Sequence, residues 1–142
     1  MIKKIDHVAV AVRSLESALK IYAQGLGFRD FAIEEITEQK VRVALLPVGE
    51  SRIELLAPTA DDSPIAGFLA ERGEGLHHIC FQVENLAEAL RKLKAEGWRL
   101  IDPQPRPGAG GSLIGFIHPS AACGVLIELM QAGGAQTHTN LE

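Results

Sequence analysis

The sequence predicts an α+β fold built from two βαβββ modules that are related by pseudo-two-fold symmetry. The first observation is that one order of expected elements (strand, helix, then three strands) occurs twice along the chain. The second is that residues recur: 6–12 (DHVAVAV) align with 77–83 (HHICFQV), and 52–56 (RIELL) align with 126–130 (LIELM). A repeat of both order and residues predicts two similar half-sheets.

The first module is expected to span about residues 4–58. Apolar, β-branched runs bounded by turn residues predict its strands, and apolar residues at helical spacing predict a helix that begins at Leu15 and ends near Gly25 and Gly27. The expected strands are 5–12, 28–35, 40–48 and 52–57.

A connecting helix is expected at about 64–73, because Pro64 suits a first helical turn and Gly73 suits a helix end. The second module then spans about 75–131, with a helix that follows the N-cap residue Asn85. Its expected strands are 76–83, 99–102, 112–118 and 125–130, and a Pro- and Gly-rich loop covers 103–111. Residues 132–142 are small and polar, and we expect a flexible tail there.

Composition limits the classes of function. The chain has 142 residues, enough for one compact domain, and 46% of them are hydrophobic while 23% are charged, which argues against intrinsic disorder. Fourteen Lys and Arg residues against 18 Asp and Glu residues give a net charge of −4. We therefore expect neither a nucleic-acid nor a membrane partner.

Location and redox state follow from simple features. The first residues lack the apolar core of a secretory signal, and no apolar run approaches the length of a transmembrane helix, so a cytoplasmic location is expected. The cysteines are Cys80 and Cys123. Cys80 lies in an apolar run and is expected to be a small buried residue rather than a disulfide partner or a reactive thiol.

The repeat places one histidine on the first strand and one glutamate on the last strand of each module. These residues are His7, Glu54, His78 and Glu128. Each lies within an apolar strand, where a polar or charged group is costly without a partner. A divalent cation would be such a partner, because imidazoles bind it and carboxylates also neutralise its charge.

The alternative is that each residue is structural. A single histidine on a strand is usually a core or edge residue, and a glutamate can point to the solvent face. Two His/Glu pairs in register across a repeat favour the metal site. His77 points to the opposite face from His78, and His118 has no counterpart in the other module.

Five stretches carry a family resemblance: IDHVAVAV at 5–12, RIELLAP at 52–58, GEGLHHICF at 73–81, GAGGSLIGFIHP at 108–119 and GVLIEL at 124–129. With the duplicated βαβββ order, the chain resembles the vicinal oxygen chelate (glyoxalase/bleomycin resistance) superfamily. Within it the chain is most similar to the methylmalonyl-CoA epimerase family. The resemblance implies a curved mixed sheet around a metal cleft, the vicinal oxygen chelate fold, and a homodimer.

The resemblance also implies an isomerase of propionate metabolism that interconverts (2R)- and (2S)-methylmalonyl-CoA, an acyl-CoA substrate, through a chelated enolate. One divalent metal ion per chain would stabilise the charge that develops when the C2 proton leaves. Four protein ligands with two open positions make an octahedral site, which favours Co²⁺, or else Mn²⁺ or Ni²⁺, over Zn²⁺ in a closed tetrahedral site.

Epimerisation needs proton transfer on both faces of C2. By resemblance Glu128 is one catalytic base. Val43 stands where some family members carry a glutamate, so Glu54 or a metal-bound water is left as the second base. Gly110, Gly111 and Ser112 are expected to bind substrate through backbone N–H groups, or to form only a flexible turn. Arg106, beside them, either favours an anionic substrate or is solvated.

Two other functions stay open. One is another enzyme of the superfamily, either a glyoxalase I (lactoylglutathione lyase) or an Fe²⁺ dioxygenase; the fourth candidate ligand, Glu54, counts against a dioxygenase, which needs two histidines and one carboxylate. The other is a non-enzymatic module that binds a small molecule. The sequence identifies no pocket for the nucleotide end of coenzyme A.

Overall fold

Each βαβββ repeat of the chain contributes four strands that pair in a mixed parallel and antiparallel pattern. The computed structural model describes residues 1–133, so most of the expected tail lies outside the described residues. The chain divides into two units, which we call the N-terminal unit (His7–His77) and the C-terminal unit (Met1–Asp6 together with the chain from His78 onward). Among the described residues, no helix is long and apolar enough to cross a membrane.

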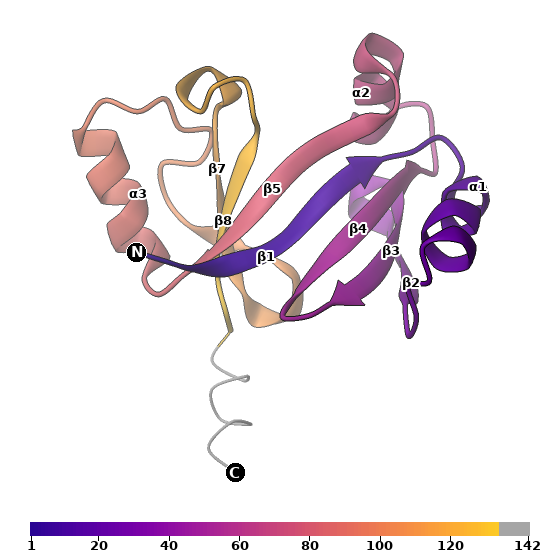
Figure 1. The fold of residues 1–142 in the computed structure, drawn as a ribbon. Coiled ribbons are helices and arrows are strands. Elements are labelled where there is room, and N and C mark those ends of the chain that lie inside the picture. The colour runs from indigo at the N-terminus through magenta and orange to yellow at the C-terminus, as the bar shows by residue number, and fades with distance from the viewer. Residues whose placement is uncertain (134–142) are drawn as a thin grey trace. The chain divides into compact units, whose positions relative to one another are not determined.

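The N-terminal unit holds a sheet in the order β1-β4-β3-β2 (Figure 1). Strand β1 pairs with β4 in parallel, and the other neighbours are antiparallel. Its elements are β1 (Ile2–Ala11, from His7 on), α1 (Leu15–Leu19), a π-helical stretch (Lys20–Gly25), β2 (Ala32–Ile36), a 3₁₀ turn (Thr37–Gln39), β3 (Val41–Val48), β4 (Ser51–Pro58) and α2 (Pro64–Arg72).

The C-terminal unit repeats this arrangement in the order β5-β8-β7-β6. Strand β5 pairs with β8 in parallel, and the other neighbours are antiparallel. Its elements are β5 (Gly75–Val83, from His78 on), α3 (Leu86–Ala95), β6 (Arg106–Pro107), a 3₁₀ turn (Ala109–Gly111), β7 (Leu113–Ile117), a second 3₁₀ turn (Pro119–Ala121) and β8 (Ile127–Gln131).

The register of the two sheets matches residue by residue. In the N-terminal unit Ala9 is paired with Glu54, and in the C-terminal unit Cys80 is paired with Glu128. These are the positions that the sequence repeat aligns. The predicted α+β fold of two βαβββ modules is therefore confirmed.

The helix that follows the first strand covers the same sheet face in both units. Helix α1 packs on a cluster that includes Leu15, Leu46 and Leu55, and α3 packs on a cluster with Leu86, Ile117 and Leu129. In the repeat, Leu15, Leu46 and Leu55 are the counterparts of Leu86, Ile117 and Leu129. Val12 and Ala18 of the first cluster are likewise the counterparts of Val83 and Ala89 of the second. Burying one such leucine contributes about 1.5–3 kcal/mol, so each unit has its own substantial core.

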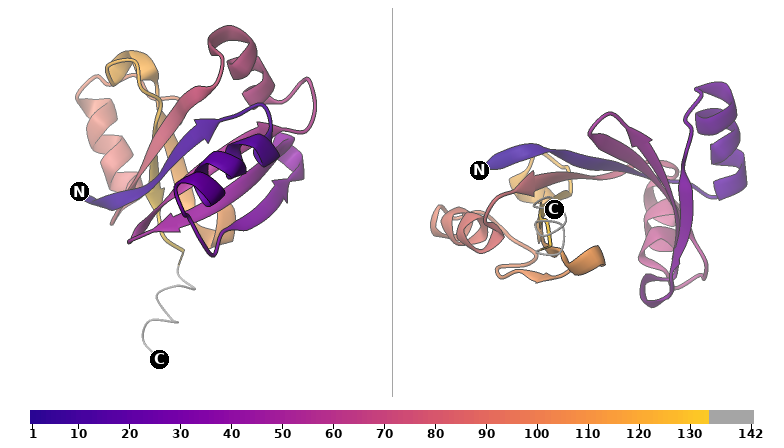
Figure 2. Two further views of the ribbon diagram at one scale, coloured as in Figure 1. Left: turned by 45° about the vertical axis from the view of Figure 1, so that its right-hand side comes forward. Right: turned by 90° about the horizontal axis from the view of Figure 1, so that it is seen from below.

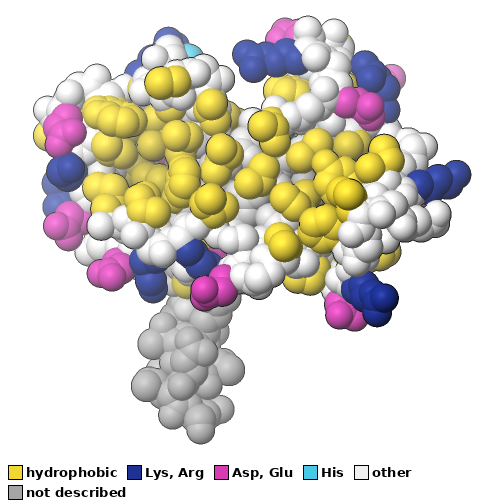
Figure 3. Space-filling view, viewed as in Figure 1, with side chains coloured by type: hydrophobic (Ala, Val, Ile, Leu, Met, Phe, Trp, Pro, Cys, Tyr) yellow, Lys and Arg dark blue, Asp and Glu magenta, His cyan; other side chains and the backbone are white. Residues whose placement is uncertain are grey.

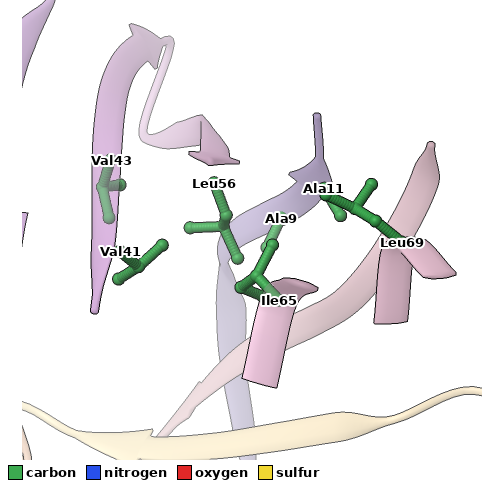
Figure 4. Packing of buried hydrophobic residues seen from close by; sticks show 7 residues of the cluster. All are labelled: Ala9, Ala11, Val41, Val43, Leu56, Ile65 and Leu69. Carbon is green, nitrogen blue, oxygen red and sulfur yellow. The ribbon is translucent and has the colours of Figure 1, made fainter. Parts of the chain in front are cut away.

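Helix α2 packs on the opposite face of the N-terminal sheet (Figure 2). Ile65 and Leu69 of α2 point toward side chains from three strands, as Figure 4 shows. Those side chains are Ala9, Ala11, Val41, Val43 and Leu56. Side chains alternate between faces along a strand, so residues two apart share a face. His7 therefore lies on the same face as Ala9, and Glu54 on the same face as Leu56.

Three expectations about local structure are wrong. The strand expected at 99–102 is reduced to a single bridge between Leu100 and Ile117, because the Asp102 carboxylate accepts the Phe116 N–H that a ladder carbonyl would accept. A short strand, β6, lies instead within the stretch expected to be loop. The helix that begins at Leu15 becomes π-helical from Lys20.

Candidate active site

His7 and Glu54 lie together on the N-terminal sheet. His7 is on β1 and Glu54 is on the parallel neighbour β4, and Ala9, which shares a face with His7, pairs with Glu54. The Nδ1 atom of His7 is 3.4 Å from Oε2 of Glu54, and the side chains are only 7% and 12% exposed. The structure therefore brings these two predicted ligands into contact at a nearly dry position.

Arg52 adds a charge to this pair that sequence reasoning missed. It precedes Glu54 by two residues on β4, and its Nε donates a hydrogen bond of 2.7 Å to Oε2 of Glu54. The spacing of two residues places both side chains on one face, and that spacing was the available signal. Glu54 thus lies between an imidazole and a guanidinium.

His78 and Glu128 form the matching pair in the C-terminal unit. Nε2 of His78 is 3.1 Å from Oε1 of Glu128, with side chains 9% and 11% exposed. The ring of Phe116 on β7 meets the His78 ring edge to face, at 5.8 Å between centroids. Phe116 pairs with Glu128 across the strands, so the carboxylate and both rings share one face.

The donor set of each unit suits a divalent cation. An imidazole nitrogen and a carboxylate oxygen are the ligands that Mn²⁺, Co²⁺, Ni²⁺ and Zn²⁺ accept, and both pairs are nearly buried, where an unpaired carboxylate is costly. Each unit therefore offers two residues that could hold a metal ion. Val43, by contrast, is 3% exposed within an apolar cluster and offers no proton-transfer group.

The predicted substrate loop is a closed turn in the structure. The Ser112 hydroxyl donates to the carbonyl of Ala109 at 2.7 Å, and Gly108 N–H donates to the Ser112 carbonyl at 2.9 Å. Gly110 and Gly111 have φ values of 65° and 77°, which favour glycine. Ser112 is buried and its hydroxyl proton is used within the turn, so its observed role is to shape the loop.

The other histidines within residues 1–133 lie outside the two His–Glu pairs, whereas Cys80 of β5 pairs with Glu128 of β8. The His77 ring packs against Phe68 of α2 at 4.9 Å between centroids. His118 accepts the Ser120 N–H at Nδ1 and so caps a 3₁₀ turn. Cys80 is fully buried, as the sequence predicts, and Cys123 is exposed; the two cysteines form no disulfide.

The chain is similar to known proteins over most of its length. Residues 6–116 match the Glyoxalase/Bleomycin resistance protein/Dioxygenase superfamily. The ethylmalonyl-CoA/methylmalonyl-CoA epimerase of Cereibacter sphaeroides is 39% identical over 92% of this chain and 99% of its own.

Two solved structures have the same fold. A crystal structure of methylmalonyl-CoA epimerase from Mycobacterium tuberculosis is 37% identical, with a TM-score of 0.84 over 96% of this chain and 93% of its own. A methylmalonyl-CoA epimerase in complex with methylmalonyl-CoA and NH₄⁺ is 36% identical, with a TM-score of 0.84 over 93% of this chain and 96% of its own. The chain belongs to the glyoxalase/bleomycin resistance protein/dioxygenase superfamily, and within it to the methylmalonyl-CoA epimerase family.

Proposed function

We propose that the chain is a metal-dependent epimerase that interconverts (2R)- and (2S)-methylmalonyl-CoA. The observation that carries this is the nearly buried His–Glu contact at matched register in both units, in a chain 39% identical to an ethylmalonyl-CoA/methylmalonyl-CoA epimerase. The reaction removes a proton from C2, between a thioester and a carboxylate, and returns it on the other face. It needs charge stabilisation and proton-transfer groups, which these side chains can supply.

The proposed ligands of one divalent ion are His7, Glu54, His78 and Glu128. Two donors from one unit are too few for a tight site, whereas two imidazoles and two carboxylates leave two positions of an octahedron for substrate. Such a site favours Co²⁺, then Mn²⁺ or Ni²⁺, over Zn²⁺. When bound, the ion supplies a Lewis acid that stabilises negative charge on the substrate oxygens.

Glu128 is the proposed base that takes the C2 proton. Its carboxylate is 3.1 Å from Nε2 of His78, and the Phe116 ring packs on that imidazole, so the pair is oriented from two sides. Val43 carries no ionisable group, so we assign the transfer on the opposite face to Glu54 rather than to a water molecule. The Arg52 guanidinium holds the Glu54 carboxylate in one orientation.

The turn at 109–111 is the proposed contact for the polar acyl end of the substrate. Gly110 and Gly111 present backbone without side chains, and both are exposed. Oxyanions bind well to such stretches of backbone N–H groups. Ser112 contributes by closing the turn.

Hydrogen exchange tests the proposed reaction. The protein with Co²⁺ in D₂O should replace the C2 hydrogen of (2S)-methylmalonyl-CoA with deuterium, and His78→Ala and Glu128→Ala should lose metal or exchange activity. A chelated sample that regains activity with Co²⁺ is the matched control. Absence of exchange with Co²⁺ present refutes the proposal, and turnover of the methylglyoxal–glutathione adduct instead would indicate a glyoxalase.

We also propose that the chain forms a homodimer. Large hydrophobic side chains are exposed in both units, and Figure 3 shows hydrophobic side chains on the viewed surface of each. Those more than 40% exposed are Met1, Ile2, Ile5, Ile21, Leu26, Ile33, Val48, Leu76 and Ile101. Exposed apolar patches commonly mark interfaces. Light scattering should give twice the mass of the chain, and a monomer at all concentrations would contradict this.

A further inference from the structure

Arg106 lies on the same sheet face as the His78–Glu128 pair. It pairs with Ile114 across β6 and β7, and Ile114 shares a face with Phe116 because they are two residues apart. Phe116 in turn pairs with Glu128. Two strand spacings, about 10 Å, separate the backbones of β6 and β8, a distance that an arginine side chain and a small acyl group span together.

The guanidinium is held in place by two contacts. Its Nε donates to Oδ1 of Asp102 at 3.0 Å, and its central carbon lies 5.4 Å from the centroid of the Phe116 ring. Asp102 is itself fixed, because its Oδ2 accepts the Phe116 N–H at 2.8 Å. The ring that supports the guanidinium also packs against His78, so Arg106 is positioned relative to the reacting pair.

The terminal amino groups of Arg106 are directed to no residue in the described part of the chain. Its one hydrogen bond within residues 1–133 uses Nε, and the side chain is 46% exposed, whereas that of Asp102 is 16% exposed. A planar guanidinium anchored at Nε still offers donors that match a carboxylate or phosphate. This arrangement differs from a solvated loop arginine, which lacks fixed partners.

The matched position in the N-terminal unit has the opposite charge. Glu34 pairs with Val43 as Arg106 pairs with Ile114, and Val43 and Ile114 occupy equivalent positions against β4 and β8. The fold therefore does not require a cation at this strand edge. Of these two matched positions, the one on the face that carries His78 and Glu128 has the positive charge.

We propose that Arg106 is a specificity-determining residue that binds an oxyanion of the acyl-CoA substrate; this inference rests on the proposed function. Acyl-CoA substrates of this type have two sources of oxyanions, the free carboxylate of the acyl group and the phosphates of the nucleotide end. Asp102 and Phe116 are positioning residues that hold the guanidinium.

The proposed role of Arg106 is tested with the variants Arg106→Leu and Arg106→Lys and the matched control Glu34→Gln. Each is assayed with methylmalonyl-CoA and with methylmalonyl-pantetheine, which has no phosphates. Loss of a charge-assisted hydrogen bond should raise KM for methylmalonyl-CoA by about 10- to 100-fold in Arg106→Leu, with a much smaller change in kcat. Arg106→Lys should recover part of this loss, and Glu34→Gln should leave KM unchanged. An equal loss on methylmalonyl-pantetheine identifies the carboxylate, and a loss confined to methylmalonyl-CoA identifies a phosphate.

Calorimetric titration with methylmalonyl-CoA and with free CoA separates this inference from the proposed function. If the wild-type protein binds either ligand without exchange activity, the proposed function fails, and Arg106 is judged by affinity alone. Equal KM and equal affinity in the wild-type protein and in Arg106→Leu, at an unchanged Tm, overturn the inference. If Arg106→Leu does not fold, Arg106→Lys keeps the charge and should still bind more weakly than wild type; wild-type affinity in that variant overturns the inference.

Discussion

The two units share a scaffold but differ around their His–Glu pairs. In the N-terminal unit, α2 packs on the face that carries His7 and Glu54, through Ile65 and Leu69. In the C-terminal unit, the corresponding face carries Phe116 and Arg106. The strand order and the register of the paired residues are retained while the surrounding side chains have diverged. Duplication thus supplies matched His–Glu pairs, and divergence supplies different surroundings for each pair.

The carboxylates of Glu54 and Glu128 also differ in the side chains around them. Glu54 accepts a hydrogen bond from Arg52, whereas the position that matches Arg52 in the C-terminal unit is the apolar Leu126. A carboxylate that accepts a hydrogen bond from a guanidinium is held in place. This contrast supports the proposed division in which Glu128 takes the C2 proton, whereas Glu54 both holds the ion and serves the transfer on the opposite face.

The largest expected effect separates these two roles. Glu128→Gln should lower the C2 exchange rate by about 10²- to 10⁴-fold, because it removes a general base. Glu54→Gln should lower it less and should instead weaken Co²⁺ binding, since an amide oxygen is a poorer ligand than a carboxylate. Deuterium exchange at saturating Co²⁺ measures the first effect, and metal content after dialysis measures the second. Equal rate losses for the two variants at saturating metal would contradict the division.

Matched core substitutions compare the two folding units. Leu15→Ala and Leu86→Ala remove equivalent, nearly fully buried side chains under α1 and α3. Each should lower the free energy of unfolding by about 2–5 kcal/mol, through lost burial and the cavity left behind. Urea unfolding followed by circular dichroism measures both. A negligible loss for either variant would show that its cluster is not a well-packed core.

Gly133, two residues beyond β8, should tolerate less change than its repeat counterpart Thr59, which follows β4. A Cβ atom at Gly133 would lie 2.8 Å from the carbonyl oxygen of Gly111, a backbone atom that cannot easily move. Gly133→Ala should therefore cost about 1–3 kcal/mol by overpacking and should raise KM if the turn binds substrate. The matched control is Thr59→Ala, at an exposed position, which should change Tm little. A Gly133→Ala protein with wild-type Tm and KM would refute the steric argument.

The smallest effect is a pH response confined to the N-terminal unit. A hydrogen bond to backbone, followed by Arg42, holds the pKa of the exposed Glu16 below its usual 4.5. A lowered pKa adds stability above the unfolded-state value, and that stability is lost as pH falls through the folded value. Wild type should therefore have a higher Tm than Glu16→Gln at about pH 6, and this difference in Tm should disappear in more acidic buffer. The position that matches Glu16 is Ala87; a constant difference in Tm across this range would contradict the assignment.

Sequence reasoning predicts the repeated βαβββ order because hydrophobic periodicity reports which faces are buried. It also identifies the two His–Glu pairs, since a shared register across a repeat predicts shared faces. It misses β6, because the two-residue strand Arg106–Pro107 has no periodicity and contains a proline. It misses the role of Asp102 as well, since a side chain that replaces a strand partner is visible only once the turn around it is folded.

The strand residue beneath the helix differs by one methyl group between the two units. Gly115 occupies the place of Ala44, and a Cβ atom there would lie 3.0 Å from Cδ1 of Leu90. Leu90 is fully buried, whereas its counterpart Leu19 is only partly buried. The absence of a Cβ atom at position 115 thus accompanies the deeper burial of Leu90. A chimera that exchanges interior residues between the two units should therefore transfer Gly115 together with Leu90, because an alanine at position 115 would require the Leu90 side chain to shift by a few tenths of an ångström.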